Sequence, residues 1–157
     1  MNRVLSFGVA LLLIGMSAVT PWAQEGKSDA SVRDRFVGAW RLAWLEEPDA
    51  NGNVHRADCT GLLTYTRDGH MSVQVMYGNP PAGNKAAPVQ YAQDGYEASF
   101  GRYEINTAHA FTFHVEGALV RTLIGKDLKR VYEFSGNQLI VKSPDPNEHW
   151  RVAWERY

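Results

Sequence analysis

The most constraining feature of this sequence is the alternation of apolar and polar residues in short segments that turn residues separate. A period of two places apolar side chains on one face of a β-strand and polar ones on the other. Turn signals such as Asp68-Gly69, which is typical of a two-residue hairpin, lie between these segments. We expect strands over residues 36–44, 62–66, 71–77, 101–106, 110–117, 129–134, 138–142 and 148–156. The pattern predicts an all-β, antiparallel domain of about eight strands, either a sandwich or a barrel.

One internal segment departs from this alternation. Residues 79–88 contain three prolines and a glycine, which predicts a loop. Residues 89–99 then carry Tyr91, Tyr96 and other apolar side chains near one side of a helical projection, and Pro88 suits a helix start. We therefore expect one short helix over 89–99, near the mouth of a barrel.

The positions of the tryptophans favour a barrel over a sandwich. Trp40 and Trp44 lie in the first expected strand, and Trp150 and Trp154 lie in the last. A spacing of four puts both members of each pair on one face of a strand. If these strands pair antiparallel, Trp40 lies opposite Trp154 and Trp44 opposite Trp150. Pairing of the first strand with the last would close the sheet.

The same register places Arg156 opposite Gly38 and diagonal to Trp40, where its guanidinium would cover the indole ring. Gly38-Ala39-Trp40, at the start of the first strand, together with Arg156 at the end of the last, resembles the lipocalin Gly-x-Trp…Arg signature. We expect these residues to be structural, because they join the two ends of the sheet.

A fuller set of motifs resembles the bacterial and fungal lipocalin-like domain family. The matching segments are Phe36-Val-Gly-Ala-Trp-Arg-Leu42, Gly61-Leu-Leu-Thr-Tyr-Thr66, Asp68-Gly-His-Met-Ser72, Phe100-Gly-Arg-Tyr103, His114-Val-Glu-Gly117 and Trp154-Glu-Arg156. The resemblance implies a closed antiparallel eight-stranded barrel with a central cavity, and it implies no particular ligand. Residues 120–129 depart from the family pattern, so the resemblance does not predict the shape of the barrel rim that they form.

The N-terminal segment predicts export. Arg3 is the only charged residue before Glu25, and a run of small and apolar residues follows it over 4–19. This is the pattern of a secretory signal peptide. We expect a signal peptide over 1–23, cleaved after Ala23, a mobile leader over 24–33 and a barrel domain over 34–157. Cleavage after Ala18 and a retained N-terminal anchor are the alternatives. Export would make the protein periplasmic or secreted.

Charge and cysteine content exclude several classes of partner. The whole chain has a net charge of −1, and loss of Arg3 with the signal peptide makes it −2. A near-neutral chain without a lysine and arginine cluster is not expected to bind nucleic acid, or a membrane surface after cleavage. Cys59 is the single cysteine, so no internal disulfide can form. It is either an inert thiol or a bridge to another molecule, and the oligomeric state stays open.

A barrel of this size has room for packed side chains or for one small ligand. We expect an exported protein that binds a small apolar or aromatic molecule in its cavity, since aromatic walls with a few polar groups are typical of ligand sites. The expected ligand-binding residues are Trp44, Tyr77, Tyr96, Phe111 and Trp150 as walls, with Arg102, His114 and Glu116 as polar anchors. Arg130 reaches either the cavity or the surface.

His114 and Glu116 share one face of a strand, opposite to Phe113 and Val115. If that face points inward, the pair suits an isomerase, dehydratase or cyclase in which His114 carries a proton and Glu116 orients it. The alternation favours the outward orientation, because the phenylalanine belongs in the interior. A barrel filled by its own side chains, acting as an interaction module, is the remaining alternative.

The sequence predicts no metal and no cofactor. His55, His70, His109 and His149 are scattered without ligand spacing. No glycine-rich phosphate loop follows an expected strand, so a nucleotide cofactor has no support.

Overall fold

The computed structural model describes residues 32–49, 51–78 and 91–157. The expected signal peptide over 1–23, nearly all of the leader over 24–33 and the whole proline-rich segment over 79–88 lie outside the described residues. Within the described part, no helix has the length and hydrophobicity needed to cross a bilayer.

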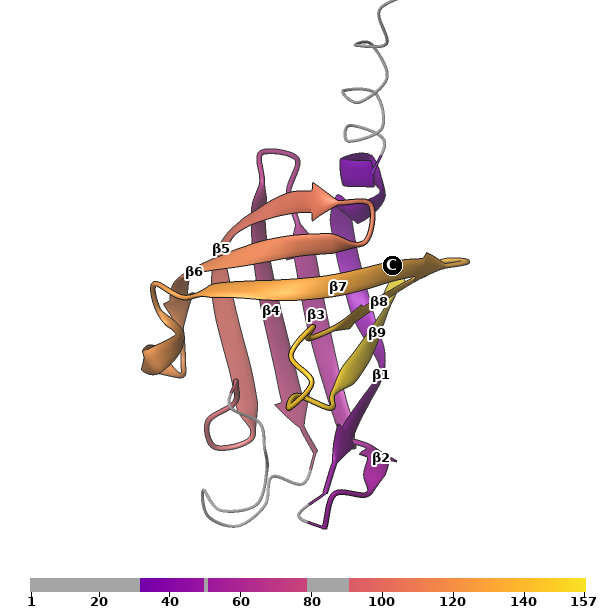
Figure 1. Cartoon of the computed structure of the whole chain (residues 1–157), viewed down its shortest axis with the longest axis vertical. Coiled ribbons are helices and arrows are strands. Elements are labelled where there is room, and N and C mark those ends of the chain that lie inside the picture. Colours follow the sequence, from indigo (N-terminus) through magenta and orange to yellow (C-terminus); the bar gives the residue numbers. More distant parts are fainter. Residues whose placement is uncertain (1–31, 50, 79–90) are drawn as a thin grey trace, which may run out of the picture.

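In the described part of the chain, nine antiparallel strands form one sheet that closes on itself (Figure 1). They are β1 (Gly38–Pro48), β2 (Val54–Arg56), β3 (Cys59–Tyr65), β4 (His70–Tyr77), β5 (Tyr96–Thr107), β6 (Ala110–Ala118), β7 (Asp127–Ser135), β8 (Gln138–Lys142) and β9 (Arg151–Arg156), with a 3₁₀ turn, η1 (Arg121–Leu123), after β6. Because β1 pairs with both β3 and β9, eight strands make the closed barrel, and β2 pairs only with the end of β1. The predicted closed, eight-stranded, antiparallel barrel is confirmed.

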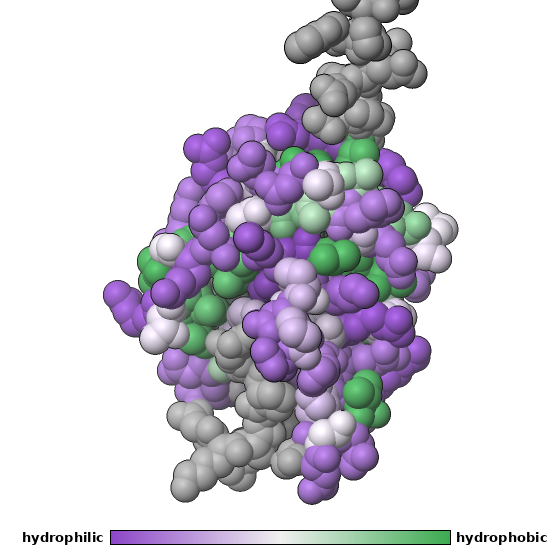
Figure 2. Space-filling model, viewed as in Figure 1, coloured by the Kyte–Doolittle hydropathy of each residue, from purple (hydrophilic) through white to green (hydrophobic). Residues whose placement is uncertain are grey.

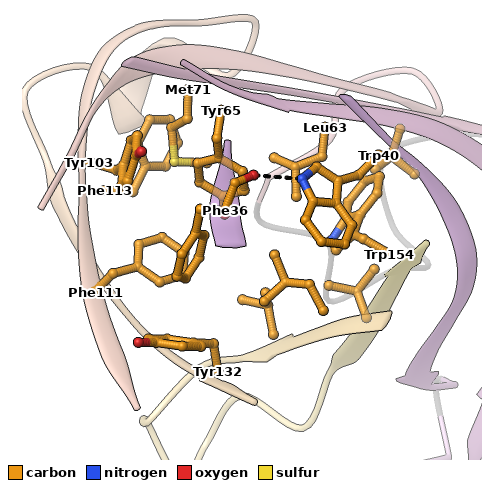
Figure 3. Close-up of a cluster of buried hydrophobic side chains, with 14 of the residues drawn as sticks. Phe36, Trp40, Leu63, Tyr65, Met71, Tyr103, Phe111, Phe113, Tyr132 and Trp154 are labelled. Atoms are coloured by element: carbon orange, nitrogen blue, oxygen red, sulfur yellow. Dashed lines mark hydrogen bonds between the residues drawn. The ribbon is translucent and has the colours of Figure 1, made fainter. Parts of the chain in front are cut away.

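The pairing of the first strand with the last is as predicted, but its register differs. Trp40 lies opposite Arg156, and Leu42 lies opposite Trp154. The predicted pair of Trp40 with Trp154 is therefore wrong by two residues along β9. Both indoles are still buried in one interior, each only 2% exposed, and they lie near each other in Figure 3.

A β-bulge in β1 explains why the second tryptophan pair is also wrong. The register shifts between Leu42 and Trp44, and an extra residue in one strand reverses the side that later residues face. Trp44 therefore lies on the outer surface, with the guanidinium groups of Arg56 and Arg151 5.4 and 5.0 Å from its ring centre. Its expected partner, Trp150, precedes β9.

Residues 32–36 are helical, so the chain does not enter its first strand at Phe36 as expected. Phe36 is instead completely buried and closes one end of the barrel. Five aromatic rings surround it at centre-to-centre distances of 4.7–6.0 Å, most of them visible in Figure 3: Tyr65, Tyr103, Phe111, Tyr132 and Phe134. This aromatic plug fills that end of the interior.

Arg156 fastens the helical segment to the barrel. Its guanidinium lies 4.4 Å from the ring centre of Trp40, which confirms the predicted cover over the indole. It also donates hydrogen bonds to the carbonyls of Val37, at 2.8 Å, and Arg35, at 2.6 Å. The Trp40 indole N–H donates to the Phe36 carbonyl at 2.8 Å. Side chains of both β1 and β9 therefore bind the backbone around Phe36.

The helix expected over 89–99 is wrong for the described residues 91–99. Asp94 and Gly95 have φ values of 53° and 76°, which form a left-handed turn and interrupt any helix. The chain then enters β5 at Tyr96. The side chains of Glu97 and Ser99 continue the inward face of this strand, so β-alternation begins earlier than predicted.

The barrel has the two-sided character that the alternation requires. Core side chains face inward, and the surface in Figure 2 is mostly hydrophilic, with smaller groups of hydrophobic residues.

Replacing Arg156 by Met should lower the free energy of unfolding by about 2 kcal/mol, because two charge-assisted hydrogen bonds and a cation–π contact are lost together. Urea titration followed by tryptophan fluorescence measures this change. Arg41→Met is the matched control, because its ion pair with Glu155 is solvent-exposed and contributes little. Equal stability of the two variants would show that Arg156 does not hold the plug.

Candidate functional site

A cavity of about 550 Å³ lies between the aromatic plug and the other end of the barrel. Its deeper wall is apolar and includes Leu63, Val73, Val75, Phe111, Phe113, Val141 and Trp154. Toward the open end the wall becomes polar, with Glu47, Tyr77, Glu97, Ser99 and Arg130. Pro48, Tyr91, Asp145 and Trp150 are among the residues at the rim. The cavity is therefore apolar at its base and charged near its mouth.

The bulge in β1 brings Glu47 into this cavity. Beyond the shift, Leu45 and Glu47 face inward, where they are only 7% and 8% exposed. Glu47 accepts a hydrogen bond from the hydroxyl of Tyr77 at 3.2 Å. Burial raises the pKa of Glu47 above its ordinary value, although the hydrogen bond from Tyr77 acts in the opposite direction.

Glu97, the second residue of β5, also lines the cavity. Burial raises the pKa of Glu97 to about 7, against the opposing effect of the Arg130 guanidinium, and the nearby Glu47 carboxylate adds to the rise. Glu97 therefore changes its charge near neutral pH. A group of this kind in a cavity is a candidate functional residue.

Arg130 supplies a buried positive charge on the opposite wall, and it is only 9% exposed. Its guanidinium lies 5.1 Å from the ring centres of both Tyr91 and Trp150, and it donates one hydrogen bond to the Lys129 carbonyl at 2.9 Å. One oxygen of Glu148 accepts hydrogen bonds from the Tyr91 hydroxyl and from the Trp150 indole N–H, both at 2.9 Å. These contacts hold the two rings around the guanidinium.

The structure brings together three of the predicted ligand-binding residues. Tyr77, Phe111 and Trp150 all line the cavity. Trp44 and Tyr96 do not. The bulge turns Trp44 outward, and Tyr96 is 38% exposed because it lies on the outer face of β5.

The predicted polar anchors also lie outside the cavity. Arg102 lies opposite His114 on the outer face of the β5–β6 pair, and Glu116 is exposed on the same side. His114 contacts Asp127, with 2.7 Å between Nδ1 and the carboxylate oxygen, and Glu104 lies 3.7 Å from its other ring nitrogen. The outward alternative is therefore correct, because Phe113 and Val115 occupy the inner face.

The sequence reasoning missed Glu47, Glu97 and Glu148, and it left the position of Arg130 open. Extending the alternation of β5 backward from Tyr103 would have predicted Glu97 and Ser99 as inward residues. Nothing in the local pattern of β1 indicates Glu47, because its orientation depends on the bulge.

Cys59 is partly buried at the start of β3, and it is a free thiol in the described chain. Burial raises the pKa of this thiol to about 11, so it stays protonated and weakly nucleophilic at neutral pH. Within residues 32–49, 51–78 and 91–157, no three His, Cys, Asp or Glu side chains are grouped so that they could hold a metal ion.

Comparison with known proteins identifies the family. A family model described as a lipocalin-like domain matches residues 37–156. No curated protein matches the sequence. A lipocalin-like protein from Bacteroides uniformis is 14% identical with a TM-score of 0.46, covering 78% of this chain and 99% of that one. An uncharacterized protein from Bacteroides eggerthii is 12% identical with a TM-score of 0.46, over 78% and 99% of the two chains. A redesigned β-barrel is 10% identical with a TM-score of 0.44, over 80% and 95%.

The raised pKa of Glu97 predicts a pH dependence of stability. The folded state keeps the Glu97 proton up to about pH 7, whereas an unfolded chain releases it near 4.5, so the free energy of unfolding should fall as pH rises from about 5 to 8. Glu97→Gln removes the fall in the free energy of unfolding that ionisation of Glu97 causes. This variant should therefore be more stable than the wild type at pH 8 by up to about 3 kcal/mol. Urea titrations at several pH values measure the effect.

Glu116→Gln is the matched control, because Glu116 is exposed on the outer face of the same hairpin. Glu47 also has a raised pKa, so a smaller decline should persist in the Glu97 variant. Identical pH profiles for the wild type and Glu97→Gln would contradict the assignment.

Proposed function

This chain belongs to the lipocalin-like domain family, and we propose that it binds a small, mainly apolar or aromatic molecule inside its barrel. The observation that carries the proposal is the cavity of about 550 Å³, which lies within the range of roughly 300–1,000 Å³ for small-molecule sites. The aromatic plug occupies only one end of the barrel, so the remaining interior is available to a ligand.

The lining supports a ligand with an apolar body. Leu63, Val75 and Phe113 are each less than 5% exposed, and they provide an apolar base to the cavity. Burial of ligand surface against such a base contributes about 25 cal/mol per Å² of apolar area. Tyr77 and Trp150 add aromatic surface near the mouth, where a polar end of the ligand would lie.

Two other functions have less support. An isomerase, dehydratase or cyclase built on His114 and Glu116 requires both residues inside the barrel. His114 instead faces outward beside Asp127 and Glu104, and Glu116 is exposed. A filled barrel acting only as an interaction module requires an interior without space for a ligand. The observed cavity argues against that alternative.

Export remains part of the proposal, and its support comes from the sequence. A basic residue, Arg3, precedes the apolar run over 4–19, and the small residue Ala23 follows as the expected cleavage position. We expect the protein isolated from its own host to begin at Gln24. Intact-mass measurement tests this expectation, and a mature protein that retains residues 1–23 would contradict it.

The ligand-binding proposal predicts that a neutral, environment-sensitive dye such as Nile red binds the wild-type protein with increased fluorescence. Val75→Trp, which inserts an indole into the cavity, should weaken this binding by about 10-fold or more. Val54→Trp is the matched control, because Val54 is 60% exposed on β2, outside the barrel. Circular dichroism confirms that each variant is folded. Absence of dye binding to the wild type, or equal binding by both variants, would refute the cavity as the site.

A further inference from the structure

We infer that the ligand carries an anionic group, a carboxylate, which Arg130 holds near the mouth of the cavity. This inference rests on the proposed function and narrows it from apolar molecules in general to amphipathic organic acids. The acid group would lie beside Arg130, and its hydrocarbon or aromatic body would extend toward the apolar base that Phe111 and Val141 help to form.

The burial of Arg130 is the first observation behind this assignment. The side chain lines the cavity and is only 9% exposed, and a guanidinium remains charged at every physiological pH. Among the described residues no carboxylate oxygen lies within 4 Å of it, although buried charges are ordinarily paired. One of its five N–H donors is used by the Lys129 carbonyl, and the guanidinium also interacts with the Tyr91 hydroxyl. A ligand carboxylate would supply a counter-charge in direct contact with the guanidinium.

The surroundings of Arg130 hold its guanidinium in position before a ligand arrives. Tyr91 and Trp150 meet edge to face, with ring centres 6.0 Å apart, and both lie 5.1 Å from the guanidinium carbon. Glu148 fixes both rings through hydrogen bonds. Such an ordered cation loses little side-chain entropy on binding, and its hydrogen bonds to an anion are strong in a partly desolvated site.

The carboxyl groups of the cavity support the opposite choice, a cationic ligand: Glu47 and Glu97 lie on its wall, and Asp145 and Glu148 also line it. Glu97 faces Glu47 from β1, Tyr77 from β4 and Arg130 from β7. Glu97 has a pKa of about 7 and that of Glu47 is also raised, so both can become neutral at small cost, whereas Arg130 cannot. A bound carboxylate would raise the pKa of Glu97 further, and the resulting carboxylic acid could donate a hydrogen bond to it. Of Glu47, Glu97 and Arg130, only Arg130 therefore carries a permanent charge.

The test compares three probes with the same tail, octanoate, octan-1-ol and octylamine, by isothermal titration calorimetry at pH 7. We expect octanoate to bind the wild-type protein at least about 10-fold more tightly than octan-1-ol, as for a charge-assisted hydrogen bond. Arg130→Met should remove this difference, so that octanoate binds this variant no more tightly than octan-1-ol does. Arg102→Met, an exposed arginine on the outer face, should behave as the wild type.

Each outcome separates the inference from the proposed function. If octan-1-ol binds and octanoate binds no better, or if octylamine binds most tightly, the assignment of Arg130 is wrong while the cavity remains a ligand site. If neither the three probes nor Nile red binds, both proposals are wrong. The comparison of probes on the wild-type protein does not depend on the folding of a variant. Arg130→Lys adds a second variant, which keeps the charge but loses the guanidinium fork and should reduce the preference for octanoate.

Discussion

The pairing of β1 with β9 is the constraint on which the rest of this structure depends. It joins the two ends of the sheet, so no strand in the barrel is left with an unpaired edge, and it encloses Trp40 and Trp154 in one interior. The same pairing brings Arg156 to the start of the domain, where it covers Trp40 and binds the carbonyls of Arg35 and Val37. The same strand pairing therefore closes the barrel and attaches its N-terminal segment.

Closure also divides the interior into two unequal parts. Phe36 enters from the short helical segment and packs among aromatic rings from β3, β5, β6 and β7, which leaves no room for a ligand at that end. At the other end the inward side chains are smaller or polar, and a cavity remains. The plug stabilises the barrel, so the open end does not need to be tightly packed. Burying charged groups in the cavity costs free energy, and the packing of the aromatic core at the other end offsets this cost.

The charges in that cavity come from strands that are distant in sequence. Glu47 lies on β1, Glu97 on β5 and Arg130 on β7, and Tyr91 and Trp150 enclose Arg130 from two further segments. Within the closed barrel each of them changes the properties of the others: Arg130 opposes the rise in the pKa of Glu97, and Glu47 adds to it. These groups act as a unit only because the barrel brings their strands together.

The sequence by itself determined the strands, the closure and the inner face of most of the barrel. Alternation is a local property with a period of two, so it predicted correctly that Phe111 and Phe113 face inward, and it favoured the outward orientation found for His114. The tertiary structure alone decided the register of β9, the bulge that turns Trp44 outward and Glu47 inward, and the position of Arg130 in the cavity. A single extra residue reverses every later side chain, and its place follows from packing across strands, which no local pattern contains.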